Sequence, residues 1–173
     1  MIRDVRLLNT GSLLELQRRL RAAGNENIRS SMQRRIRRAA EPLRADLQSS
    51  IRGLNIAPPP RRGRPGGPSP TTRPLRATIA EAIRISVRTS AGGAGARVWI
   101  DRARLPADLS NGTTDMPTAI NTGRIRHPVY GNRRRWVQQN AAPGWWDRTV
   151  RAHTPRMERE VARVLDDVRS RLT

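Results

Sequence analysis

The sequence lacks three residue types altogether, because none of its 173 residues is Cys, Lys or Phe. The absence of Cys excludes disulfide bonds, thiolate nucleophiles and cysteine-ligated zinc. The absence of Lys excludes a P-loop lysine, a Schiff base and a lysine general base. With no Phe, four Trp and one Tyr are the only large aromatic side chains. We therefore expect the Trp residues to supply much of the bulky packing.

Acidic residues are also scarce: 34 Arg stand against 14 Asp and Glu, for a formal charge of +20. The use of Arg alone has two explanations. Arg binds phosphate and carboxylate through two parallel hydrogen bonds, and a GC-rich genome favours Arg, Ala, Gly and Pro codons. The codon explanation accounts for the choice of Arg over Lys but leaves the excess charge standing. We therefore expect polyanionic partners, either nucleic acid or acidic neighbouring proteins.

Long apolar runs are missing as well. No stretch approaches the roughly 20 residues that a membrane span needs, and the first ten residues lack a signal-peptide core. We accordingly expect no membrane partner and a cytoplasm-like compartment. Leu, Ile and Val together number 34 of 173 residues, which is enough for a small core only. The sequence thus favours oligomerisation or a partner that buries part of the surface.

The spacing of apolar residues predicts an α+β fold, with an N-terminal arm over 1–11 and one domain over 12–173. A capping box at Ser12–Glu15 predicts a helix that stops at Gly24. A second, long helix should start near Asn25 or Asn27, and Pro42 should kink or break it. Its apolar stripe consists of Ile28, Met32, Ile36, Ala39, Leu43, Leu47 and Ile51.

Alternating apolar residues predict an antiparallel hairpin at about 83–101, within a small antiparallel sheet. A Pro/Arg-rich loop over 57–74 precedes it and is incompatible with a helix or an inner strand. The loop is either a solvated connection or an arm that touches nucleic acid or an acidic subunit. The residues that would make such contacts are Arg61, Arg62, Arg64 and Arg73.

The stretch 102–122 is predicted to be a loop with one helical turn near 116–121. Further on, Trp136–Gln138 is compatible with a strand and Pro143-Gly144 with a turn, and a helix is expected from Trp145. Thr154-Pro155 matches an N-cap and first helical turn, which predicts the start of the C-terminal helix there. The apolar stripe of that helix consists of Met157, Val161, Val164, Leu165, Val168 and Leu172.

Motifs of catalysis, cofactor binding or metal ligation are not found, so we expect no enzyme, no cofactor and no metal. His127 and His153 have no partners at ligand spacing. Asp166 and Asp167 diverge on a helix, which excludes a carboxylate pair on one face and suits them to balance nearby arginines.

The aromatic residues are the stronger signal. Core packing is expected for at least two of Trp136, Trp145 and Trp146. Because Trp145 and Trp146 are consecutive, they point in different directions, so one can fill the core while the other anchors a neighbouring chain. The candidate interface residues are His127, Tyr130, Trp136, Trp145 and Trp146, and Arg133, Arg134 and Arg135 are candidates for contact with DNA or an acidic partner.

The block Arg126-His-Pro-Val-Tyr-Gly-Asn132, followed by Trp136-Val-Gln138 and Pro143-Gly-Trp-Trp146, resembles a known family. It is similar to the minor tail component, or tail-completion, family of long-tailed bacteriophages, in the branch of phages that infect GC-rich actinobacteria. The resemblance extends from about residue 13 to the end and includes the segment Arg73–Arg76. The proline-rich stretch 58–74 departs from the short connection of that family, so its role does not transfer.

The resemblance implies a structural virion protein of the phage neck, made in the host cytoplasm. Such proteins form a ring, usually hexameric, between head-completion or stopper proteins and the tail terminator or tail tube, and packaged DNA passes through the lumen. Six copies would carry a formal charge of six times +20. Acidic neighbours or DNA would have to offset the repulsion between them. Two alternatives remain open: a stand-alone, sequence-nonspecific nucleic-acid-binding protein, and a basic membrane-surface protein that would rest on the helix over 28–51.

Overall fold

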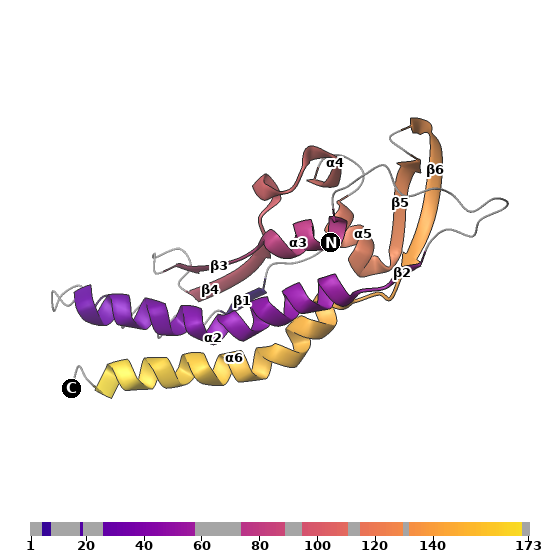
Figure 1. Ribbon diagram of the computed structural model, residues 1–173. Helices are drawn as coiled ribbons and strands as arrows, with labels where there is room; N and C mark the ends of the chain where they lie inside the picture. The colour runs from indigo at the N-terminus through magenta and orange to yellow at the C-terminus, as the bar shows by residue number, and fades with distance from the viewer. Residues whose placement is uncertain are drawn as a thin grey trace. The chain divides into compact units, whose positions relative to one another are not determined.

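The computed structural model has an α+β architecture, as the sequence predicts (Figure 1). It describes residues 5–7, 18, 26–57, 74–88, 95–110, 115–129 and 132–170. The predicted helix at 12–24 lies outside these residues except for Arg18, and so does the loop at 57–74 except for its two end residues. Within the predicted arm, Val5–Leu7 form strand β1.

Contacts within the chain define two compact units, each assembled from separate stretches of sequence. The first unit comprises Met1–Ile2, Leu47–Ala82 and Asp101–Thr149. The second unit comprises Arg3–Asp46, Ile83–Ile100 and Val150–Thr173. Two long helices, α2 and α6, contribute residues to both units.

Helix α2 runs over Glu26–Gly53 and continues through Pro42. The predicted alternative of a break at this proline is therefore wrong. The side chain of Ile28, the first residue of the predicted stripe, lies outside the described part of the chain. The other positions are as predicted except at one, where Ala40 is buried and Ala39 is half-buried. The buried stripe consists of Met32, Ile36, Ala40, Leu43, Leu47 and Ile51.

Helix α6 runs over Trp145–Ser170 and passes through Pro155. The predicted helix start at Thr154 is thus wrong, and the helix begins nine residues earlier. The Thr154 hydroxyl donates to the carbonyl of Val150 at 2.9 Å, so it bonds back into the preceding turn instead of capping a new helix. Its buried apolar side chains are Met157, Val161 and Val164 in the second unit and both Trp residues in the first.

The second unit holds these helices antiparallel. Arg35 lies 2.5 Å from Asp167, and His153 Nε2 lies 2.6 Å from Asp46. Because the earlier residue of α2 meets the later residue of α6, the chain directions are opposed. Asp167 therefore balances an arginine, as the sequence suggests.

The sheet of the second unit has the order β1-β4-β3. Strands β3 (Ile83–Arg88) and β4 (Gly95–Ile100) form the predicted hairpin, with Ile85 opposite Val98. Alternation places the apolar residues of both strands on one face, and Ile83 and Val98 are almost completely buried there. The other face carries Arg84, Arg97 and Trp99, all half-buried.

The first unit contains a second sheet, of order β2-β6-β5, that the sequence indicates only in part. Its strands are β2 (Ile56–Ala57), β5 (Arg124–Val129) and β6 (Asn132–Ala141). The predicted strand at Trp136–Gln138 is the middle of β6. Short helices accompany this sheet: α3 (Leu75–Glu81), the 3₁₀ turn Arg102–Arg104, α4 (Ala107–Ser110) and α5 (Met116–Thr122).

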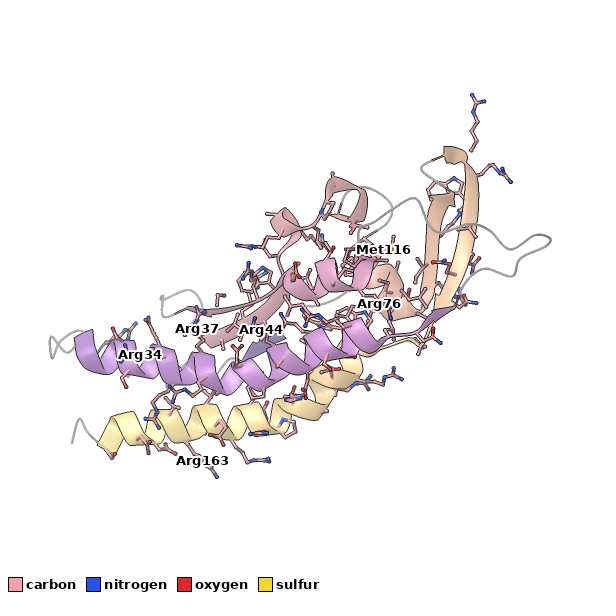
Figure 2. The ribbon with its side chains drawn as sticks, in the orientation of Figure 1. Arg34, Arg37, Arg44, Arg76, Met116 and Arg163 are labelled. Atoms are coloured by element: carbon pink, nitrogen blue, oxygen red, sulfur yellow. The ribbon has the colours of Figure 1, made fainter. Side chains whose placement is uncertain are left out.

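Side-chain to backbone bonds join α3 to the end of α2 within the first unit. Arg76, labelled in Figure 2, donates to the Leu54 carbonyl at 2.6 Å, and Gln48 donates to the Ala80 carbonyl at 3.0 Å. Both acceptors are main-chain carbonyls at or next to the C-terminal end of a helix.

Candidate functional site

The β5–β6 hairpin (Figure 1) carries five of the twelve site residues that the sequence predicts: His127, Arg133, Arg134, Arg135 and Trp136. Arg124 lies opposite Asn140, Arg126 opposite Gln138, and Pro128 opposite Trp136. The register shifts between Pro128 and Val129, toward the tip of the hairpin. Below this irregularity, alternate residues share a face of the ribbon.

One face of the hairpin is exposed and basic. We call it the basic face and define it as Arg124, Arg126, Trp136, Gln138 and Asn140, each of which is exposed. On the opposite face, Ile125 is buried, and Val137 and Gln139 are half-buried. The hairpin is therefore amphipathic: one side packs inward, and the described side chains of the other side are polar apart from one indole.

The hairpin contains no carboxylate in its own sequence. Residues 116–146 contain five Arg and no Asp or Glu. Arg134 and Arg135, in the irregular part near the tip, are exposed as well. By contrast, α6 from Asp147 onward carries five Asp and Glu beside six Arg, so it holds acids that offset its arginines and the hairpin does not.

Arg126 and Trp136 form a cation–π pair on the basic face. The guanidinium carbon lies 5.0 Å from the centroid of the indole ring. The two residues are diagonal neighbours across the strands, a separation that long side chains can bridge. Trp136 stays 42% exposed. The stacking orients the guanidinium and leaves its hydrogen-bond donors available at the edge.

A glycine closes the base of the hairpin. Gly123 has φ of 80°, and its carbonyl accepts a hydrogen bond from Ala141 N at 3.1 Å. A Cβ atom at this position would lie 2.7 Å from the Ala141 carbonyl oxygen. Only glycine fits both the left-handed backbone and this approach, so Gly123 fixes where β5 begins opposite the end of β6.

Asn121, near the end of α5, forms hydrogen bonds with the start of α6. Its Oδ1 accepts from the Trp146 backbone N–H at 3.0 Å, and its Nδ2 donates to Asp147 Oδ2 at 2.8 Å. Its carbonyl accepts from Gly144 N at 2.7 Å. Gly144 is the N-cap of α6 and has no side chain with which to cap it. Asn121, 9% exposed, therefore supplies from α5 the acceptor that an N-cap side chain ordinarily provides.

Both consecutive tryptophans lie in the core. Trp145 and Trp146 are each 1% exposed, and their rings meet edge to face with centroids 5.6 Å apart. The expectation that at least two tryptophans pack in the core is confirmed. The expectation that one of this pair anchors a neighbouring chain does not fit the structure, because neither indole presents surface.

The remaining predicted residues divide into two groups. His127 and Arg133 lie on β5 and β6, where the structure describes their backbone only. The others lie outside the described residues: Tyr130, Arg61, Arg62, Arg64 and Arg73. Interface or partner roles for all of these remain predictions.

Five residues were not predicted as site residues: Asn121 and four members of the basic face, namely Arg124, Arg126, Gln138 and Asn140. The alternation of Arg124, Ile125 and Arg126 is a strand signal that could have paired this segment with the strand at Trp136. Asn121 gave no signal, because its role depends on a helix that starts 24 residues later.

Other kinds of site have little support in the described part of the chain. Three or more His, Asp or Glu side chains do not gather into a metal-ligating group among these residues. No helix among them combines the length and the apolarity that crossing a bilayer requires.

No family model, no curated protein and no solved structure matches the chain. A function for this protein therefore has to be argued from its own residues and from the basic face, the glycine-closed hairpin and the Asn121 junction.

Proposed function

We propose that this chain is a structural component of a bacteriophage neck, which joins or completes the tail at the head–tail interface as a ring around the DNA channel. One observation carries the proposal. The block 126–146, on which the resemblance to tail-completion proteins rests, is one continuous structural piece. It comprises most of β5, all of β6, the turn at Gly144 and the first turn of α6.

Local geometry explains why these residue types stand together. Gly144 permits the turn, the two buried tryptophans fill the core behind it, and Asn121 caps the helix that follows. The order of elements also supports the proposal. A long helix, a hairpin, the block 126–146 and a C-terminal helix follow one another, which is the order that the resemblance implies.

The distribution of charge is compatible with a ring in a neck. Like charge on neighbouring copies opposes assembly unless acidic partners or DNA offset it. The acid-free hairpin carries five Arg, so acidic partners or DNA would have to offset its charge in such a ring. The partners in this proposal are other copies of the chain, the adjoining head-completion or stopper and tail-terminator or tube proteins, and packaged DNA.

Deletion of the gene from its phage tests the proposal. We expect filled heads and separate tails in lysates, and joined particles again when the gene is supplied in trans. Normal numbers of infectious virions from the deletion would overturn it. A reconstruction of the particle neck is expected to show density for the chain as a ring.

The exposed basic face favours a second candidate, a stand-alone protein that binds nucleic acid without sequence preference. The deletion experiment separates the two, because a stand-alone binder is not needed to join heads to tails. A deletion that leaves particle joining intact but changes DNA or RNA metabolism in the infected cell would favour this second candidate.

A further inference from the structure

Two surfaces of the molecule combine Arg with Trp. In the second unit, Arg97 lies 5.0 Å from the Trp99 ring, but both side chains are half-buried. In the first unit, every member of the basic face is exposed. The basic face is therefore the surface that a large ligand can reach.

We infer that the basic face docks on the phosphate backbone of double-stranded DNA without reading its sequence. Arg124, Arg126, Gln138 and Asn140 are all hydrogen-bond donors of the kinds that contact phosphate oxygens. The face includes no carboxylate, and none occurs anywhere between residues 116 and 146. The inference rests on this surface alone and stands whether or not the chain forms a ring.

The four donors are closely spaced. Two residues that share a face of one strand lie about 6.6–6.8 Å apart along it, which is the separation of Arg124 and Arg126. Gln138 and Asn140 lie directly across the ribbon from them, at roughly 4.5–5.5 Å between Cβ atoms. Two guanidinium groups are therefore available for neighbouring phosphates, and two amides lie beside them as additional donors.

DNA fits this face better than an acidic protein does. Protein interfaces have a largely apolar centre from which charged residues are depleted. The basic face instead places arginines and amides around a single indole, and it has no exposed aliphatic side chain among its members. The basic face is thus complementary to negative charge and to hydrogen-bond acceptors, and the sugar–phosphate backbone supplies both along its whole length.

Duplex DNA also fits better than a single strand. Proteins that bind single strands stack successive bases on several aromatic side chains. The basic face has one such side chain, Trp136, and Arg126 already covers one side of its ring. Stacking of successive bases therefore has no second platform on this face.

Binding of the full-length protein to a 30-base-pair duplex of arbitrary sequence, measured by fluorescence anisotropy across a salt series, tests the inference. The test variant is Arg124→Gln/Arg126→Gln. The matched control is Arg156→Gln/Arg159→Gln, which removes the same charge from two exposed positions of α6. Circular dichroism shows whether each variant keeps the native fold.

The expected magnitude follows from counterion release. Each lost phosphate contact lowers the slope of log K against log salt by about 0.9, so the test variant should lose about 1.8 from the slope. Its affinity at 0.1 M salt should fall by roughly 60-fold, since about 0.9 log unit per contact is lost over the decade below 1 M. The control should retain the slope within about 0.3, because it removes charge but no contact.

Equal changes in the test and control variants would overturn the inference, because they would show generic attraction to a basic protein. Tighter binding of a single strand of the same length, abolished by Trp136→Ala, would overturn the choice of duplex. Unchanged DNA binding together with lost binding to a neighbouring acidic virion protein would assign the face to that protein instead. If the double variant does not fold, Arg124→Gln alone should lower the slope by about 0.9, and no change would count against the inference.

Discussion

Replacement of Asn121 by Ala is expected to destabilise the protein by about 2–3 kcal/mol, although Asn121 itself is not one of the predicted site residues. Truncation removes the acceptor of the Trp146 N–H and the donor to Asp147. A buried donor left without a partner costs about 1–3 kcal/mol, and loss of an N-cap acceptor costs about 1 kcal/mol in most helices. Both values count the loss of the same acceptor for the Trp146 N–H, so they are not summed. We take about 2 kcal/mol for this loss, and the partly exposed hydrogen bond to Asp147 brings the total to about 2–3 kcal/mol.

Urea unfolding followed by tryptophan fluorescence measures this effect, since Trp145 and Trp146 lie directly behind the bond. Asn55→Ala is the matched control, because Asn55 is exposed and its loss should change the free energy of unfolding by less than about 0.5 kcal/mol. A loss below about 0.5 kcal/mol in Asn121→Ala as well would refute the reasoning and mean that the junction is held by packing alone.

Asn121→Asp separates the acceptor from the donor. It retains an oxygen for the Trp146 N–H but places a second carboxylate beside Asp147. Two like charges at hydrogen-bond distance raise the pKa of one carboxylate in the folded protein. Stability is therefore gained on protonation, and the deficit of Asn121→Asp should be larger at pH 7 than at pH 4. A deficit that does not depend on pH would argue against direct contact between residues 121 and 147.

Two further sets of substitutions test the hairpin and the core. Gly123→Ala should lose about 2 kcal/mol or more, because φ of 80° strains an L side chain by about 1–2 kcal/mol and the added Cβ meets the Ala141 carbonyl. Gly53→Ala, where nothing lies within 4 Å of the new atom, should be neutral or stabilise by up to about 1 kcal/mol; equal losses at the two glycines would contradict this account. Trp145→Ala or Trp146→Ala should each cost about 3–5 kcal/mol, whereas Trp136→Ala should cost under about 1 kcal/mol. Thermal unfolding of the three variants measures the contrast, and a comparable loss for Trp136→Ala would show that its exposed ring packs more tightly than the structure indicates.

Elements whose residue pattern lies within a single segment were predictable from the sequence. The long helix follows from apolar residues at steps of three and four, and its stripe differs from the prediction by one position, at Ala40. The first hairpin follows from the alternation between Ile83 and Val87. In both cases the signal lies within a single element, so no knowledge of distant partners is needed.

Elements that depend on distant residues were not predictable. Strand β5 contains Pro128 and His127, which weaken its strand signal, and pairing with β6 decides its conformation. The helix expected from Trp145 is confirmed. Its continuation through residues 154 and 155 was not predicted, because Thr154-Pro155 matches the start of a separate helix locally and tertiary contacts override that signal. The basic face depends on both strands at once, so its members cannot be assigned to one surface before the register is known.

The interleaving of the two compact units has a consequence for synthesis. The first unit requires residues up to Thr149, and the second requires the part of α6 that follows. A chain that emerges from the ribosome N-terminus first can therefore complete neither unit until most of its length has been made. Pairing such as that of Asp46 with His153 must wait for the last third of the chain. A single cut in the gene cannot separate the residues of one unit from those of the other either, because the stretches of the two units alternate along the sequence.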